Sequence, residues 1–289
     1  MFRVRTAGSR THGQAATDRL TRNSPNRHVF WEAVFKREAP GLCWVELNRD
    51  RMKAATPLSI CSVPATNSCL LRGLPQASFA MLMASARPMI LQEGGTLFDR
   101  GDPGDGCYLL QNGVVKVTVQ ASTGEERIVA ILGPGTMVGE LAMLDGLPRS
   151  ATVVAMSLSQ LLFLPQEAFR KTAWEDPAIN RFLMLSLVER LRQADVELAA
   201  ASFLTVRARV ARALLILALH LGERTTQPDQ VLMGPELRQG DLASLAGVTR
   251  ETVSRTLSDW CRVGVLQRLA RATYGIDLKK LDDESRFGE

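Results

Sequence analysis

The spacing of apolar residues changes near Pro177, and this change constrains the fold more than any other feature of the sequence. From Leu91 onward, short segments rich in β-branched and aliphatic residues alternate with turn signals, which is typical of a β-sandwich or barrel over residues 85–165. The Asn112-Gly113 pair lies between two of these segments and predicts a tight hairpin. The strand-like segments begin at Cys107, Val114, Arg127, Ala151 and Leu161.

After Pro177 the apolar or small residues recur at spacings of three and four, which predicts a helix that pairs with another helix. We expect a dimerisation helix over residues 176–202. The alternative is that this seam packs only against the chain's own β domain. The seam consists of Met184, Leu187, Leu191, Ala194, Leu198 and Ala201.

Residues 1–70 follow neither period, and four prolines interrupt them. We expect a disordered extension over residues 1–69, which is an upstream addition or the result of a misassigned start codon, with Met52 as the other candidate start. The Arg-rich, acid-poor beginning also resembles an organellar transit peptide, but it lacks the apolar core of a secretory signal.

Charge is distributed unevenly in this chain of 289 residues, which is long enough for two domains. Residues 203–280 carry 12 Lys and Arg against 7 Asp and Glu, whereas residues 71–202 carry 11 against 14. The basic segment suits contact with phosphate, although a solvated basic surface would give the same counts. Five cysteines without close pairs, and no long apolar run, argue against a disulfide scaffold, a CxxC zinc site and a membrane span. We therefore expect a protein of the reducing cytoplasm.

The most specific motif runs from Val138 to Ala155 and contains Gly-Glu-Leu, a short helical segment and Pro-Arg-Ser. Arg149 can meet the two exocyclic oxygens of a cyclic phosphate with paired, charge-assisted hydrogen bonds. Backbone N–H groups after Gly139 and the Ser150 hydroxyl could add further donors. The motif closely resembles the phosphate-binding cassette of cyclic-nucleotide-binding domains, both in the bacterial cyclic-AMP receptor protein family and in protein kinase A regulatory subunits.

The resemblance implies that Glu140 accepts the ribose 2′-hydroxyl; the alternative is that Glu140 and Arg149 merely pair with each other. A Thr-Ser pair contacts adenine in that family, and the corresponding residues here are Ala194 and Asp195, of which neither matches. Asp195 could instead accept from an amino or imino group of a different base. We expect a cyclic nucleotide as effector, with cyclic AMP favoured, and no covalently bound cofactor. The candidate binding residues are Gly139, Glu140, Leu141, Arg149, Ser150 and Asp195.

A second motif, from Gly240 to Trp260, has the outline of a helix-turn-helix. Gly247 permits the turn, and Thr249 is a good N-cap for the second helix. At about 100° per residue, that helix places polar residues on one face and apolar residues on the opposite one. The polar face holds Arg250, Glu251, Ser254 and Arg255, and the apolar face holds Val253, Leu257 and Trp260. Residues 262–276 fit a small wing hairpin.

The polar face has the chemistry that the major groove of DNA requires. Arg bonds bidentately to guanine and Glu accepts from cytosine, while Thr249 and Thr252 can reach phosphate. The motif resembles both branches of the CRP/FNR family: Arg250, Glu251 and Arg255 match the cyclic-AMP branch, whereas Glu251, Ser254 and Arg255 match the fumarate-nitrate branch. Half-sites of the TGTGA kind and of the TTGA-like kind therefore both stay open.

The resemblance covers about residues 70–280 and implies an α+β fold with a cyclic-nucleotide-binding β-roll (double-stranded β-helix), a long dimerisation helix and a winged helix-turn-helix. We expect a sensor domain over residues 70–175, the dimerisation helix over 176–202, a DNA-binding domain over 203–280 and an acidic tail over 281–289. The implied protein is a homodimeric, allosteric transcription regulator and not an enzyme. Its partners would be double-stranded DNA with a palindromic site and RNA polymerase, with no membrane.

Two other functions are weighed. An iron–sulfur redox sensor would need closely spaced cysteines, but Cys43, Cys61 and Cys69 are widely spaced and Cys107 falls in a strand-like segment. A cyclic-nucleotide-binding module that regulates an enzyme would leave the helix-turn-helix unexplained. The effector, the promoters, and the choice between activation and repression stay open.

Overall fold

The computed structural model describes residues 75–286 except residues 228, 271 and 272. The extension expected over residues 1–69, together with its three cysteines Cys43, Cys61 and Cys69, lies outside the described residues. Within the described part, no helix is both long enough and apolar enough to span a bilayer.

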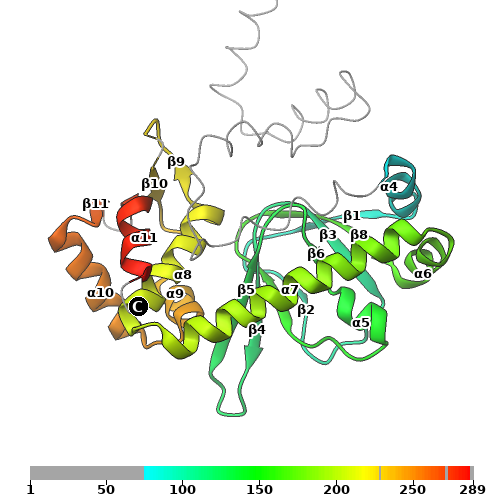
Figure 1. Ribbon diagram of the computed structural model, residues 1–289, viewed down its shortest axis with the longest axis horizontal. Coiled ribbons are helices and arrows are strands. Elements are labelled where there is room, and N and C mark those ends of the chain that lie inside the picture. The colour runs from blue at the N-terminus through cyan, green and yellow to red at the C-terminus, as the bar shows by residue number, and fades with distance from the viewer. Residues whose placement is uncertain (1–74, 228, 271–272, 287–289) are drawn as a thin grey trace, which may run out of the picture. The chain divides into compact units, whose positions relative to one another are not determined.

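Eight strands form two antiparallel four-stranded sheets in the first domain (Figure 1). One sheet has the order β1-β8-β3-β6 and the other β2-β7-β4-β5. Apolar side chains such as Leu110, Val115 and Leu161 fill the core of this β-roll. The expected β domain is confirmed. Its strands are β1 (Arg87–Leu91), β2 (Thr96–Phe98), β3 (Gly106–Asn112), β4 (Val115–Gln120), β5 (Glu126–Leu132), β6 (Met137–Val138), β7 (Thr152–Ala155) and β8 (Ser159–Pro165).

The hairpin expected at Asn112-Gly113 is wrong, although the turn itself is present. Gly113 has a φ of 90°, as expected for a tight turn. However, β3 and β4 belong to different sheets, so the turn carries the chain from one sheet to the other. The antiparallel hairpin that follows is β4 with β5: these two strands pair from Val115 with Leu132 to Gln120 with Glu126, with one register shift between Val117 and Thr118.

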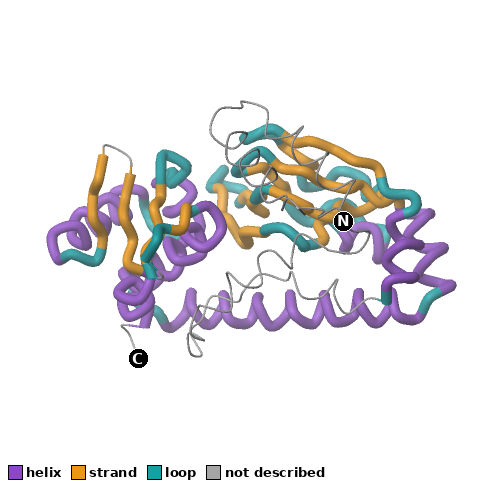
Figure 2. The backbone as a smooth tube through the Cα atoms, turned by 90° about the horizontal axis from the view of Figure 1, so that it is seen from above, coloured by secondary structure: helices purple, strands orange, loops and turns teal. Residues whose placement is uncertain are grey.

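Four helices accompany the β-roll: α4 (Gln76–Met83), α5 (Glu140–Asp145), α6 (Gln166–Glu175) and α7 (Pro177–Phe203). Asp176 caps α7 by accepting a 2.9 Å hydrogen bond from the Ala178 backbone N–H, and Pro177 occupies the first turn. The helix expected after Pro177 is therefore confirmed, and it runs without interruption for 27 residues (Figure 2).

Only the first turns of α7 are anchored in the first domain. Ile179, Phe182 and Leu183 are buried there in a cluster that also contains Phe169 of α6 and Leu82 of α4. From Met184 onward the apolar side chains are mostly exposed. The seam therefore does not pack against the chain's own β-roll.

The second domain surrounds α8, whose central residues are almost all apolar because it is covered on most sides. Leu214 of α8 lies in one core with Leu242, Trp260 and Ile276. Four strands in the order β11-β12-β10-β9 form a sheet, so the expected wing hairpin is confirmed and is extended by two earlier strands. The elements are α8 (Val206–Leu221), β9 (Glu223–Arg224), β10 (Gln230–Met233), α9 (Gln239–Ala246), α10 (Arg250–Val263), β11 (Leu266–Ala270), β12 (Thr273–Asp277) and α11 (Leu278–Arg286).

Helix α11 corrects the expected acidic tail over residues 281–289. Leu281 is fully buried in the core of the second domain. Glu284 accepts a 3.0 Å hydrogen bond from Nη2 of Arg207 on α8. Residues 281–286 thus pack on the DNA-binding domain, because an amphipathic pattern of leucine and carboxylates suits a helix with one buried face.

Candidate functional site

Gly139 shapes the candidate cassette at the start of α5. It has a φ of 81°, and a Cβ atom there would lie 2.5 Å from Nη1 of Arg149 and 3.1 Å from the Phe98 ring. The first distance is shorter than real Cβ contacts, and the second is tighter than most of them. Glycine is therefore required for the arginine to approach the backbone at this point.

Arg149 is 3% exposed and is held by the protein on three sides. Its Nη1 donates to the Gly106 carbonyl at 2.8 Å and to the Gly139 carbonyl at 2.7 Å. Its guanidinium carbon lies 4.3 Å from the centre of the Phe98 ring, a cation–π distance.

The remaining edge of the Arg149 guanidinium consists of Nη2 and Nε. Nη2 is 3.0 Å from Oδ1 of Asp105, whose side chain is 67% exposed, and Nε has no hydrogen-bond partner among the described residues. A single exposed carboxylate thus occupies an edge that can donate two parallel hydrogen bonds. The same edge fits two oxygens of a phosphate.

Glu140 is 1% exposed and faces α7. Its Oε1 lies 2.9 Å from Nη1 of Arg190, and Nη2 of Arg190 donates to the Met137 carbonyl at 2.6 Å. The ion pair is close, but its geometry is not that of a hydrogen bond, and neither carboxylate oxygen has a hydrogen-bond donor among the described residues. A buried carboxylate without a donor is rare, so Glu140 is an open acceptor for a hydroxyl group.

Glu140 and Arg149 do not pair with each other, so this alternative is wrong. Each has a different partner, Arg190 and Asp105, which the motif itself did not indicate. Sequence reasoning missed both partners as well as Phe98. Arg190 interrupts the exposed apolar surface of α7, and Asp105 lies in the Gly- and Asp-rich turn before β3, but neither signal names a partner.

The other candidate cassette residues lie at the surface. Leu141 is 40% exposed at the start of α5, and Ser150 is exposed next to Arg149. Asp195 is exposed on α7, about one and a half turns beyond Arg190, and makes no hydrogen bond or ion pair with the cassette within the described chain. The structure therefore brings Gly139, Glu140 and Arg149 together but leaves Asp195 apart from them.

Cys107 lies in β3 and is fully buried. Burial, and then the nearby carboxylate of Glu140, raise the pKa of this thiol far above its usual range. A buried protonated thiol is a poor metal ligand. Among the described residues, no group of three or more His, Cys, Asp and Glu side chains is placed to hold a metal ion.

The candidate DNA-reading helix α10 begins as expected. Oγ1 of Thr249 accepts a 3.3 Å hydrogen bond from the Thr252 backbone N–H, and lies 3.0 Å from Oγ1 of Thr252. The pKa of Glu251 is lowered, first by a hydrogen bond from its own backbone N–H and then by one from the Thr249 hydroxyl. Glu251 is thus a carboxylate at neutral pH.

The two faces of α10 differ as the helical period predicts. Val253, Leu257 and Trp260 are at most 2% exposed, and they pack into the core of the second domain. Arg250, Glu251, Ser254 and Arg255 are exposed. Within the described chain neither Arg250 nor Arg255 makes a hydrogen bond or ion pair, so both guanidinium groups are available to a partner.

Comparison with known proteins agrees with this architecture. Residues 88–175 match the cyclic nucleotide-binding domain family, and residues 208–284 match the Crp-like helix-turn-helix domain family. A cyclic AMP receptor protein from Thermus thermophilus is 36% identical over 223 residues, which cover 76% of this chain and 98% of the relative. The chain belongs to the CRP/FNR family of transcription regulators.

Further members of this family resemble the regulator in sequence and in fold. A CRP-like cAMP-activated global transcriptional regulator from Mycobacterium tuberculosis is 30% identical over 217 residues, 75% of this chain and 96% of the relative. A solved CRP-family transcriptional regulator from Thermus thermophilus is 26% identical with a TM-score of 0.59, over 68% of this chain and 96% of that one. This CRP/FNR-family protein is thus a DNA-binding transcription regulator with an effector domain.

Proposed function

We propose that a cyclic nucleotide bound between the cassette and α7 controls the DNA binding of this CRP/FNR regulator, with cyclic AMP as the first candidate. The proposal rests on the pair of open groups at the site: the donor edge of Arg149 and the buried, unsatisfied carboxylate of Glu140. Their chemistry matches the phosphate and the ribose hydroxyl of such a ligand. The backbone of Gly139 and Leu141 and the Ser150 hydroxyl would add donors at the cassette.

The ligand would exchange partners at two points. Its phosphate would replace the exposed carboxylate of Asp105 on Arg149. Its ribose hydroxyl would donate to Glu140, whose present neighbour Arg190 belongs to α7. The contact between Glu140 and Arg190 would therefore differ with and without ligand, and α7 leads to the DNA-binding domain. An allosteric switch requires such a contact that differs between its two states.

Cyclic AMP is proposed because relatives are named as cyclic AMP receptors or cAMP-activated regulators. Cyclic GMP is the second candidate, because the exposed carboxylate of Asp195 could accept hydrogen bonds from the amino and imino groups of guanine.

The long helix supports a homodimer. Met184, Leu191 and Leu198 are 61–69% exposed, although they are large apolar side chains. A second copy of α7 would bury this seam, and two copies of α10 would then read a palindromic site with half-sites about 34 Å apart. RNA polymerase is the proposed partner on the promoter, and the cytoplasm, where the DNA lies, is the proposed compartment. We propose residues 70–175 as sensor, 176–202 as dimerisation helix and 203–286 as DNA-binding domain.

Calorimetry of the full chain with cyclic AMP, cyclic GMP and cyclic di-GMP tests the proposed ligand. We expect saturable binding of a cyclic mononucleotide at the wild-type cassette and its loss in Arg149→Ala. If none of the three binds, the chain works without a cyclic nucleotide, as a ligand-independent or otherwise controlled member of the family.

Selection from random-sequence DNA followed by gel shift tests the proposed reading of DNA. Arg255→Ala should cost about 1–3 kcal/mol and relax the preference at one guanine per half-site, whereas removing the Thr252 hydroxyl should weaken binding to all sequences about equally. If Arg250→Ala changes base preference, the half-site is of the TGTGA kind; if it only weakens binding, the TTGA-like reading is favoured. Recovery of no palindrome would contradict the assignment of α10.

A further inference from the structure

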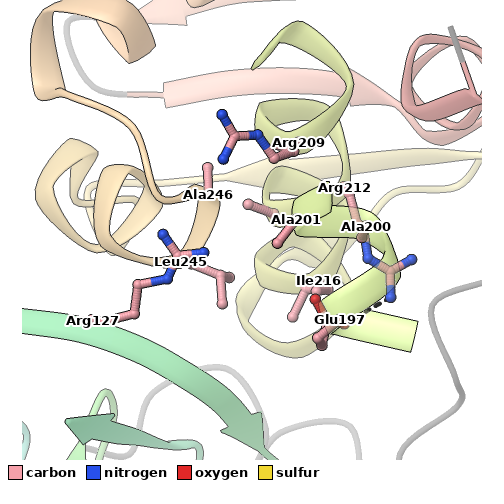
Figure 3. Close-up of a pocket in the computed structure, with 10 residues that line it drawn as sticks. Arg127, Glu197, Ala200, Ala201, Arg209, Arg212, Ile216, Leu245 and Ala246 are labelled. Atoms are coloured by element: carbon pink, nitrogen blue, oxygen red, sulfur yellow. Dashed lines mark hydrogen bonds and ion pairs between the residues drawn. The ribbon is translucent and has the colours of Figure 1, made fainter. Parts of the chain in front are cut away.

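Three arginines line a small cavity that is separate from the cassette (Figure 3). It lies where the end of α7 meets α8, α9 and β5, has a volume of about 30 Å³ and is partly open to solvent. Figure 3 shows Arg127 reaching from β5 toward Leu245 and Ala246 of α9. The polar lining consists of Arg127, Arg209, Arg212 and Glu197.

Arg212 is the most deeply placed of the three. Its side chain is 8% exposed, and Nη2 lies 2.7 Å from Oε1 of Glu197. Its Nε is buried without a hydrogen-bond partner among the described residues. The same Oε1 of Glu197 also accepts a 2.9 Å hydrogen bond from the neutral amide of Gln193.

Arg209 and Arg127 converge on the same glycine with no carboxylate between them. Nη1 of Arg209 makes a long hydrogen bond of 3.5 Å to the Gly247 carbonyl, and its Nε is buried and unpartnered. Nη1 of Arg127 would lie 1.4 Å from a Cβ atom at Gly247, so its guanidinium presses against that residue. Neither arginine forms an ion pair anywhere in the described chain.

The lining therefore holds three guanidinium groups and one carboxylate. Like charges that converge on one cavity repel each other. A buried N–H group without an acceptor also costs free energy unless an ion or a water molecule accepts its hydrogen bond. An anion of about two negative charges with several acceptor oxygens would balance the charge of this lining and accept from its free N–H groups. Guanidinium groups recognise phosphate in this way.

We propose that this cavity is a second effector site that binds a phosphate group, as inorganic phosphate or as the phosphate of a phosphomonoester. Arg127 belongs to the sensor domain, whereas Arg209 and Arg212 belong to the DNA-binding domain. A phosphate held by all three would tie the two domains together at the point where the chain leaves α7. This site does not depend on the proposed cyclic nucleotide, because none of its residues belongs to the cassette.

The test is a titration of the full-length wild-type protein with inorganic phosphate, at constant ionic strength maintained by chloride. Calorimetry should give saturable binding, and thermal unfolding should shift to higher temperature as phosphate is added. The double variant Arg127→Ala, Arg209→Ala should weaken phosphate binding by at least about tenfold, since it removes two of the three charged donors. Arg127→Ala alone, on an exposed side chain of β5, should weaken it measurably even if the double variant does not fold.

Two matched variants separate this site from others. Arg170→Ala removes one positive charge at an exposed arginine of α6 and should bind phosphate as the wild type does. Arg149→Ala removes the arginine of the cassette and should keep the saturable phosphate binding that the Arg127 variant weakens. Loss of binding in Arg149→Ala would place the anion in the cassette and overturn the proposal. The proposal would also be overturned if the wild type showed no saturable phosphate binding, or if Arg127→Ala and the double variant bound phosphate as tightly as the wild type does.

A second series distinguishes the source of the phosphate group. Ribose 5-phosphate and adenosine 5′-monophosphate are compared with inorganic phosphate on the wild type and on Arg149→Ala. Tighter binding of a monoester that survives in Arg149→Ala assigns the site to a phosphomonoester. Tighter binding of the free ion assigns it to inorganic phosphate.

Discussion

At the scale of single residues, the cassette depends on which anion faces Arg149. Asp105 occupies one nitrogen of the guanidinium in a partly exposed ion pair, which is worth little in free energy. A phosphate offers two acceptor oxygens to the same edge. We therefore expect Arg149→Ala to cost about 2–5 kcal/mol of cyclic-nucleotide affinity, and Arg149→Lys to lose much of it as well, because an ammonium cannot reproduce two parallel bonds.

Asp105→Asn is the matched residue-scale test of this competition. The amide removes the negative charge that pairs with Arg149 but keeps the shape of the side chain. We expect cyclic-nucleotide affinity, measured by calorimetry, to be maintained or increased, since the ligand no longer displaces a carboxylate. A loss as large as that of Arg149→Ala would mean that Asp105 positions the arginine instead of competing with the ligand.

At the scale of elements, α7 presents an apolar seam that its own chain leaves uncovered. Leu191 is 65% exposed at the middle of this seam. Leu191→Glu would place two carboxylates opposite each other in a dimer, so sedimentation should show a shift from dimer to monomer. Arg192→Glu, on an adjacent exposed position outside the seam, should remain dimeric. If Leu191→Glu also stays dimeric, the subunits associate through another surface.

Helix α11 gives a second prediction at this scale. The hydrogen bond from Arg207 holds the pKa of the Glu284 carboxyl below its usual range. A lowered folded-state pKa means that this contribution to stability is complete at neutral pH and is lost as the pH falls through the folded-state pKa. Glu284→Gln should therefore reduce the free energy of unfolding by about 1 kcal/mol at pH 7, and the difference from wild type should shrink in acid. Asp283→Asn, an exposed neighbour, should have no such effect.

At the scale of the whole molecule, ligand and DNA should influence each other equally. If cyclic AMP raises the affinity for DNA by a factor within the usual range of about 5–150, DNA must raise the affinity for cyclic AMP by the same factor. Titrating the ligand into free protein and into the protein–DNA complex measures both sides of this cycle. In Arg149→Ala the DNA affinity should no longer depend on cyclic AMP. If no cyclic nucleotide changed the DNA affinity of the wild type, the proposed allosteric control would be wrong.

Local patterns alone were enough to predict five of the eight strands of the β-roll (β3, β4, β5, β7 and β8), helix α7, and the two faces of α10. The period of apolar residues and the Thr249 cap act within a few residues, so propensity and burial agree there. The cassette motif likewise brought Gly139, Glu140 and Arg149 to one site, because they lie within eleven residues of each other.

The tertiary structure alone decided which residues those side chains meet. Arg190 reaches Glu140 from 50 residues away, and Asp105 reaches Arg149 from 44. The assignment of β3 and β4 to different sheets, and the meeting of Arg127 with Gly247, also depend on how separate elements pack. No period or motif in one segment encodes its contact with a distant one, because that contact arises only when several hydrophobic surfaces are buried together.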